Sequence, residues 1–126
     1  MRVRVVRRGP AGKYEMWARC RDPELWPAWM AGVRSVESGD AALRVGLEGE
    51  LSFPGGLRGR FDVVDVDDVA TTWTRIERIG PVSIRIEQRV DEGFGSIELI
   101  GTAPVVLAYV PFARRSLDRL LRRGFG

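Results

Sequence analysis

The sequence TTWTRIERIGPVSIRIEQRVDEGFGSIELI, residues 71–100, contains three alternating segments separated by short turn sequences. Gly80-Pro81 separates the first segment from the second, and Asp91-Glu92-Gly93 separates the second from the third. In the middle segment every second residue is apolar, apart from one glutamine, which is typical of a strand with one buried face. Strands joined by turns this short pair antiparallel. The stretch therefore predicts three neighbouring strands, at 71–79, 82–90 and 95–100.

The same rhythm continues toward the N-terminus. Further strands are predicted at 2–7, 33–37, 43–53 and 57–66, with turn residues between the later ones at Gly39-Asp40, Pro54-Gly55-Gly56 and Asp67-Asp68. In 43–53 and 57–66 we expect inward-facing side chains from Val45, Leu47, Leu51, Phe53, Leu57, Phe61 and Val63. Together these segments predict a curved antiparallel sheet of seven strands.

Helical spacing interrupts this pattern twice. Residues 11–21 predict a first helix, and Asp22-Pro23 predicts the N-cap and first residue of a second short helix that ends before Gly32. From Thr102 to Arg123, apolar residues recur every three or four positions with arginines opposite, which predicts a long helix that Pro111 kinks or interrupts. The order of elements predicts an α+β fold in one domain, 1–126, with the long helix across the concave face of the sheet.

Composition limits the class of protein. The chain has 126 residues, of which 44% are hydrophobic and 29% charged, as in globular domains. No apolar run approaches the roughly 20 residues of a membrane span. The single cysteine, Cys20, forms no internal disulfide, and the N-terminal alternation of arginine and valine lacks the apolar core of a signal peptide. We therefore expect a cytoplasmic protein.

The net charge of +3 is too small to indicate nucleic-acid binding. Arginines nevertheless gather at both ends of the chain, while the acidic residues lie mainly between them. At the C-terminal end they are Arg114, Arg115, Arg119, Arg122 and Arg123. These residues form either a solvated helix face or a surface that contacts an anionic membrane or a protein partner.

The residue types exclude several chemistries. The chain contains no histidine, which excludes Ser-His-Asp and Cys-His catalysis and most zinc sites. Asp65, Asp67 and Asp68 lack the spacing of a calcium loop and are interpreted as an acidic turn. We expect neither a metal nor a cofactor, and we expect Cys20 to be a buried structural thiol.

Several side chains are expected to face the interior. Gln88 lies on the apolar face of its strand, where an amide needs a partner or a ligand, or else reaches water or backbone at the end of the strand. Arg75 points inward if Trp73 does, because both occupy the same strand face, and Tyr109 lies in the apolar half of the last helix. Trp26, Trp29 and Met30 cluster on the short helices. These residues either pack the core or line a mainly apolar ligand pocket.

The order of elements and the segment Glu15–Glu37 resemble the START-like (SRPBCC) superfamily, in particular its polyketide cyclase/dehydrase branch. The resemblance lies in Trp17, Asp22-Pro23, Trp26-Pro27-x-Trp29 and Val33-x-Ser35-Val36-Glu37, and it continues through Trp73, Gly80-Pro81 and the leucines that close the last helix. It implies a helix-grip fold, in which the sheet wraps around the C-terminal helix and encloses a cavity for a hydrophobic molecule.

Three functions follow as hypotheses. The first is binding of a small polyketide-, lipid- or quinone-like ligand, for which the candidate residues are Trp26, Trp29, Met30, Phe53, Phe61, Trp73, Arg75, Gln88 and Tyr109. The second is a cyclase/dehydrase enzyme in which Arg75 and Tyr109 polarise a carbonyl. Aromatase/cyclase relatives have a tyrosine and an arginine at positions that correspond here to about Val33 and Asp65, so that pattern is not kept. The third is an interaction module that uses the arginine-rich helix.

Overall fold

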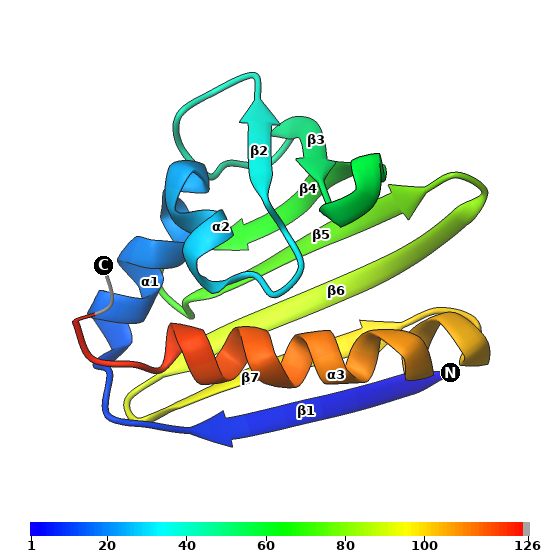
Figure 1. Ribbon diagram of the computed structural model, residues 1–126. Coiled ribbons are helices and arrows are strands. Elements are labelled where there is room, and N and C mark those ends of the chain that lie inside the picture. Colours follow the sequence, from blue (N-terminus) through cyan, green and yellow to red (C-terminus); the bar gives the residue numbers. More distant parts are fainter. Residues whose placement is uncertain (125–126) are drawn as a thin grey trace.

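Seven strands form one antiparallel sheet in the order β1-β7-β6-β5-β4-β3-β2 (Figure 1). The computed structural model describes residues 1–124. The strands are β1 (Arg2–Arg8), β2 (Ser35–Ser38), β3 (Glu48–Ser52), β4 (Arg58–Asp67), β5 (Thr72–Ile79), β6 (Val82–Asp91) and β7 (Phe94–Ile100). The predicted α+β class and the sheet of seven antiparallel strands are confirmed. The predicted domain also included residues 125–126, which lie outside the described part of the chain.

The first two helices follow β1 as predicted, in shorter pieces. α1 (Lys13–Arg21) is followed by a 3₁₀ turn, η1 (Pro23–Leu25), and by the single-turn helix α2 (Trp26–Trp29). Asp22 is the N-cap of η1, since its Oδ1 accepts a hydrogen bond of 3.0 Å from the backbone N–H of Glu24. The side chains of Trp26 and Trp29 donate to the backbone oxygens of Cys20 and Arg19, at 2.9 and 3.2 Å. These indole groups satisfy carbonyls at the end of α1 and fix α2 against it.

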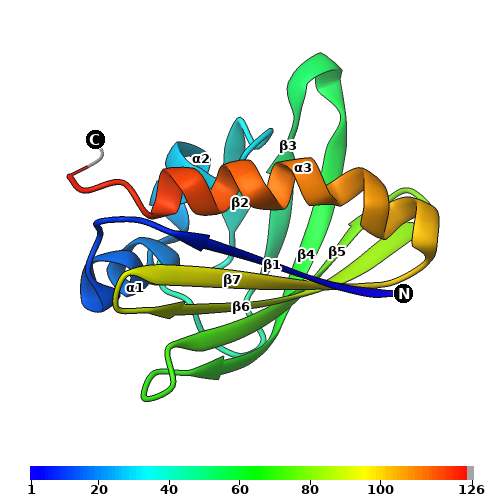
Figure 2. The ribbon, with the colours of Figure 1, turned by 90° about the horizontal axis from the view of Figure 1, so that it is seen from below.

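The long helix, α3 (Ala103–Leu120), lies along one face of the sheet (Figures 1 and 2). It contacts β1, β7 and β6, with Val106, Ala113, Leu117 and Leu120 buried beneath it. The expected interruption at Pro111 is wrong, because the helix continues through this residue. Proline removes the helical hydrogen bond to the carbonyl of Leu107, a residue on the exposed side of the helix, where the loss costs less than it would in the core.

The C-terminus of α3 is held by α1. Arg19 is buried, and its Nη1 donates to the backbone oxygens of Leu120 and Arg122 at 2.7 and 2.6 Å. A cation is favourable at this end of a helix, where carbonyl groups lack partners. Burial lowers the pKa of the Arg19 guanidinium, and the nearby carboxylate of Glu15 opposes that shift.

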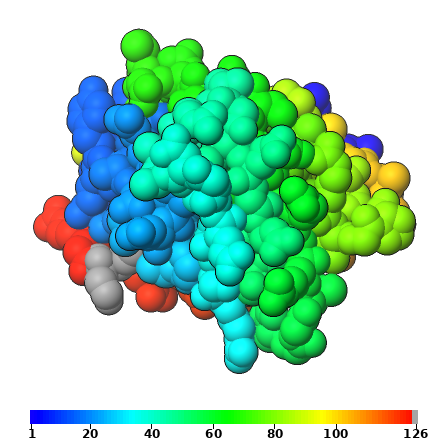
Figure 3. All heavy atoms as spheres, turned by 90° about the horizontal axis from the view of Figure 1, so that it is seen from above, coloured from blue at the N-terminus to red at the C-terminus, as the bar shows by residue number. Residues whose placement is uncertain are grey.

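The predicted strand at 43–53 is too long, since β3 begins only at Glu48. Gly46 has a φ of 90° and turns the chain, so that Leu43 and Leu47 are buried from a loop. Val45 and Leu57, both expected to face inward, are 57% and 51% exposed. β2 to β4, with their connecting loops, form much of the upper face of the molecule (Figure 3). Within the described residues, no helix is both long and apolar enough to cross a membrane.

Candidate functional site

The inner face of β5 carries a row of polar and aromatic side chains in the middle of the core. Trp73, Arg75 and Glu77 are only 1%, 3% and 3% exposed. They alternate along the strand and therefore point to the same side of the sheet. Arg75 follows Trp73 inward, as the sequence predicted. Glu77 continues the row, although we had not named it as a candidate.

These side chains form a hydrogen-bonded chain across the interior. The Nε of Arg75 lies 2.6 Å from Oε2 of Glu77, and its Nη1 lies 3.2 Å from Oε1 of Gln88 on β6. The hydroxyl of Tyr109 on α3 donates to the other oxygen of Glu77 at 2.9 Å. The amide of Gln88 also lies 3.8 Å from the sulfur of Cys20. This hydrogen-bonded network thus links α1, the sheet and α3 through polar groups that are costly to bury without a partner.

The members of this hydrogen-bonded network shift one another's pKa values. Burial alone would lower the pKa of the Arg75 guanidinium, but the carboxylate of Glu77 and the phenol of Tyr109 outweigh burial and raise it. Burial raises the pKa of Tyr109, and the negative charge of Glu77 raises it further. At neutral pH the arginine is therefore charged and the phenol is protonated, as its hydrogen bond to Glu77 requires.

Aromatic rings fill the space beside this chain. Trp26 stacks on Trp73 with ring centroids 5.2 Å apart, and Phe61 meets Trp26 edge-on at 5.1 Å. The guanidinium of Arg75 lies 4.7 Å from the ring centre of Trp73, in a cation–π contact. Trp29 and Met30 are buried as well. Trp26, Trp29, Met30, Phe61 and Trp73 thus pack the core of this structure.

A pocket of about 360 Å³ opens beside the middle of α3. Its walls come from the loop after α2, from the connection between β3 and β4, from the end of β5 and from α3. It is lined by Ala31, Gly32, Phe53, Pro54, Leu57, Ile79, Tyr109 and Phe112. None of these side chains is charged, and only Tyr109 carries a polar group, whose proton is engaged by Glu77. The pocket therefore offers an apolar lining that ends at the buried hydrogen-bonded chain.

The sequence-based candidates divide between this pocket and the packed core. Phe53 and Tyr109 line the pocket, whereas Arg75 and Gln88 lie behind Tyr109 and bond to protein groups. The expected alternative of Gln88 reaching water is wrong, since the residue is 1% exposed. Sequence reasoning missed the six other lining residues. Phe112 could have been found, because it follows Tyr109 by three positions on the helix and such a spacing indicates a shared face. Leu57 and Ile79 reach the pocket only through the pairing of strands in the sheet.

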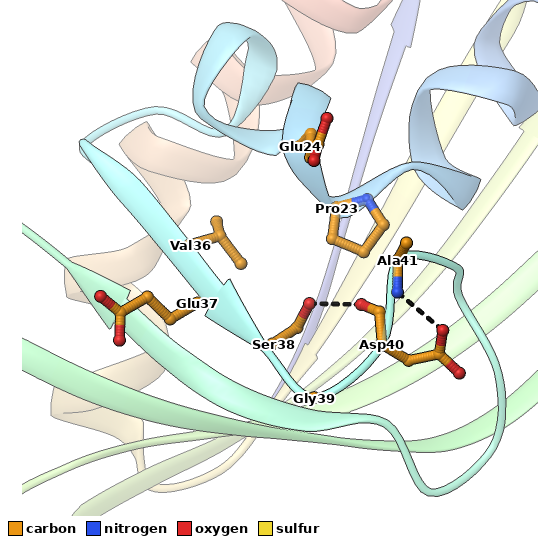
Figure 4. A pocket seen from close by; sticks show the side chains of 8 residues that line it. All are labelled: Pro23, Glu24, Val36, Glu37, Ser38, Gly39, Asp40 and Ala41. Atoms are coloured by element: carbon orange, nitrogen blue, oxygen red, sulfur yellow. Dashed lines mark hydrogen bonds between the residues drawn. The ribbon is translucent and has the colours of Figure 1, made fainter.

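A larger hollow, of about 470 Å³, lies beside β2 (Figure 4). It is lined by Pro23, Glu24, Val36, Glu37, Ser38, Gly39, Asp40 and Ala41. Two hydrogen bonds are drawn in Figure 4. The backbone N–H of Ala41 donates to Oδ1 of Asp40 at 2.7 Å, and the hydroxyl of Ser38 donates to the backbone oxygen of Asp40 at 2.6 Å. Asp40 Oδ2 also accepts from Arg44 at 2.8 Å. These bonds build a loop, so the apolar pocket is the better candidate for a ligand site.

The remaining candidate groups have structural partners. Cys20 is fully buried, and burial raises the pKa of its thiol to about 12. Asp67 accepts two backbone N–H bonds of 3.0 Å, and Asp68 accepts a bond of 3.0 Å from the indole of Trp17. Over residues 1–124, no cluster of three or more cysteine, aspartate or glutamate side chains is arranged to hold a metal ion.

No family model matches the chain, and no curated protein matches it. Solved structures do match. A protein of Mesorhizobium loti superposes with a TM-score of 0.74 at 16% identity, covering 99% of this chain and all of that one. A protein of Chromobacterium violaceum superposes with a TM-score of 0.72 at 15% identity, covering 95% of this chain and 94% of that one.

A third structure is DynU16, a protein from the dynemicin biosynthetic locus. It matches with a TM-score of 0.73 at 17% identity over 96% of this chain. The match covers 46% of DynU16, so this chain spans less than half of that protein. At such low identities these similarities establish a shared fold and nothing further.

Proposed function

We propose that the protein binds a small hydrophobic molecule of polyketide, lipid or quinone type in the pocket beside Tyr109. The observation that supports this proposal most is the uncharged lining of that pocket, at the place where α3 meets the sheet. Its volume of about 360 Å³ falls within the range of roughly 300–1,000 Å³ that ligand pockets occupy.

We also propose that the chain is a helix-grip domain of the START-like superfamily, in its polyketide cyclase/dehydrase branch. Two observations support this assignment. The two short helices follow the first strand of an antiparallel sheet, and a long C-terminal helix lies along that sheet. The motif Trp26-Pro27-x-Trp29 lies on α2 and packs one of its tryptophans against Trp73. The origin of DynU16 in a biosynthetic locus agrees with this assignment.

Recognition in this pocket would rest on shape and apolar contact. The ring of Tyr109 forms part of the wall, while its hydroxyl points to Glu77 and is occupied there. Phe53, Leu57, Ile79 and Phe112 add apolar side chains to the same wall. A ligand with a flat or branched hydrocarbon body suits such a lining better than one with charged groups, which would lose their hydration without gaining a partner.

Catalysis of the cyclase/dehydrase type is a second candidate function. Arg75 and Tyr109 converge on one carboxylate next to the pocket, and such a pair can polarise a carbonyl. Arg75 is only 3% exposed and is bonded to Glu77 and Gln88. A substrate would therefore have to open the wall formed by Tyr109 before reaching it, so we place ligand binding first.

The pocket is tested by filling it from its rim. Leu57 lines the pocket and is 51% exposed, whereas Val45 is 57% exposed and lies away from it. The neutral dye N-phenyl-1-naphthylamine reports occupancy through its fluorescence. We expect the wild type and Val45→Trp to bind the dye alike and Leu57→Trp to bind it at least about tenfold more weakly, because the larger ring occupies the dye's volume. Equal binding by all three proteins, or none by the wild type, would overturn the proposal.

A further inference from the structure

The outward face of the first half of α3 is apolar. Residues 103–113 contain no charged side chain, although a surface helix usually presents polar residues to solvent. Leu107 is 57% exposed and Phe112 is 46% exposed. Pro104, Ala108 and Pro111 are exposed as well and lie on the same side of the helix by their spacing. Figures 1 and 2 show no element of the described chain lying over this side.

The second half of the same helix and the turn after it are basic. Arg114, Arg115, Arg122 and Arg123 are exposed, and Arg119 is half-buried. The acidic residue in this half, Asp118, accepts two hydrogen bonds from Arg7, at 2.8 and 3.0 Å. Within residues 1–124, none of the five arginines forms an ion pair with a carboxylate. With five arginines and one aspartate, this half of the helix and the turn after it carry a net positive charge next to the apolar face.

A hollow of about 450 Å³ lies where the two halves meet, between α3 and the edge strand β1. It is lined by residues 3–7 of β1 and by Val110 and Arg114 of α3. Four valines and three arginines line this recess, so its lining is partly apolar and partly basic, and Arg7 is the one of these arginines that is bonded to Asp118. This combination matches the two parts of an anionic lipid, a phosphate group and the start of its acyl chains.

We propose that this face of α3 and of the turn after it, from Pro104 to Arg122, docks onto an anionic membrane surface. Leu107 and its neighbours enter the boundary between headgroups and acyl chains, and the arginines remain at the level of the phosphates. The same face of a second copy fits less well, because a symmetric pair brings two sets of arginines together while Asp118 of this face is already bonded to Arg7. The inference goes beyond the proposed ligand pocket and does not depend on it.

The test compares vesicles of phosphatidylcholine with vesicles that also contain phosphatidylglycerol. We expect the wild type to sediment only with the anionic vesicles and to dissociate as salt is added. Leu107→Glu should weaken binding at least about tenfold, and Arg115→Gln and Arg122→Gln about fivefold each. Val69→Glu, at a residue 89% exposed in the turn after β4, and Arg85→Gln on β6 are the matched controls and should bind like the wild type.

A second readout reports insertion directly. The four native tryptophans lie at most 5% exposed, so their emission should change little on docking. The emission of Leu107→Trp should shift to shorter wavelength on anionic vesicles, and that of Val69→Trp should not. The proposal is overturned if the wild type ignores anionic vesicles at low salt, or if Leu107→Glu and Val69→Glu bind alike. It is also overturned if sedimentation velocity shows a dimer that Leu107→Glu dissociates while vesicle binding is absent.

Discussion

Tyr109 of α3 and Glu77 of β5 are joined by a single hydrogen bond of 2.9 Å between the phenolic hydroxyl and Oε1. The same carboxylate holds Arg75 through its other oxygen, at 2.6 Å. Glu77 therefore connects the long helix to the centre of the sheet, at the inner wall of the apolar pocket. A substitution that removes the hydroxyl of Tyr109 and keeps its ring distinguishes a structural role of this hydrogen bond from a role in ligand contact.

Tyr109→Phe should lower the free energy of unfolding by about 1–3 kcal/mol, because the buried oxygen of Glu77 loses its donor. The phenyl ring remains, so N-phenyl-1-naphthylamine should still bind within about threefold of its wild-type affinity. Urea unfolding and dye titration measure the two quantities. Tyr14→Phe, at a residue 74% exposed, is the control and should change neither. Loss of dye binding with unchanged stability would contradict the structural role.

Arg75→Met should destabilise the protein by about 3–5 kcal/mol, because it leaves the carboxylate of Glu77 buried without its cation. Combining it with Glu77→Gln should restore part of that loss, since a neutral amide is less costly to bury than an unpaired charge. Arg44→Met breaks the exposed pair with Asp40 and serves as the control, with an expected change below about 1 kcal/mol. If Arg75→Met and Arg44→Met destabilised the protein equally in urea unfolding, the buried ion pair of Arg75 with Glu77 would not have the proposed structural role.

The sequence predicted the sheet and the helices, and it placed Arg75 on the same strand face as Trp73, because those features follow from local periodicity. The packing of a helix on a sheet is not a local feature of the sequence. The hydrogen bond between Tyr109 on α3 and Glu77 on β5, 32 positions apart, was therefore not predicted. Gln88 was recognised as an anomaly on an apolar face, but its partners Arg75 and Cys20 come from another strand and from a helix. Periodicity identifies a buried polar group and leaves its partner undetermined.

The pocket was predicted only at its edges. Phe53 and Tyr109 were named, whereas Leu57 was assigned to the core through its alternation with Phe61. In the structure Leu57 directly follows the turn at Gly55 and Gly56, whose φ angles of 79° and 78° reverse the chain before β4 begins. The strand rule does not apply to a residue in that position. Two of the tryptophans predicted as pocket residues, Trp26 and Trp73, stack on each other, because large rings gain most by filling the core.

Cys20 should be unreactive in the native protein. Its thiol is fully buried, and burial raises its pKa to about 12, so the nucleophilic thiolate is scarce at neutral pH. We expect negligible reaction with Ellman's reagent at pH 8 and one reactive thiol per chain after unfolding in urea. The double variant Cys20→Ala/Val69→Cys moves the thiol to an exposed turn and should react at once. Rapid reaction of the folded wild type would show that the core around Gln88 opens.

The same thiol should make stability depend on alkaline pH. In the unfolded chain it titrates near 9.0, and in the native state near 12. Between these values the unfolded chain releases a proton that the native state keeps, so the thiol's contribution is full below pH 9 and is lost as pH rises toward 12. The slope reaches about 1.4 kcal/mol per pH unit for one group. In urea unfolding, Cys20→Ala should flatten the decline of the free energy of unfolding between pH 9 and 10. An unchanged slope would refute the contribution of this thiol.

Gly49 should tolerate no side chain. A Cβ atom there would lie 2.7 Å from Cε1 of Phe61 and would collide with the backbone oxygen of Glu37 on β2. Phe61 cannot yield easily, because its ring packs edge-on against Trp26 in the core. We therefore expect Gly49→Ala to cost at least about 2 kcal/mol in urea unfolding, through displacement of β2 from β3. Gly39, in the loop after β2, has open space around its Cα, and Gly39→Ala should change stability by less than about 1 kcal/mol. Similar stabilities for the two variants would mean that β2 adjusts its position freely, and the edge of the sheet beside the apolar pocket would then be plastic.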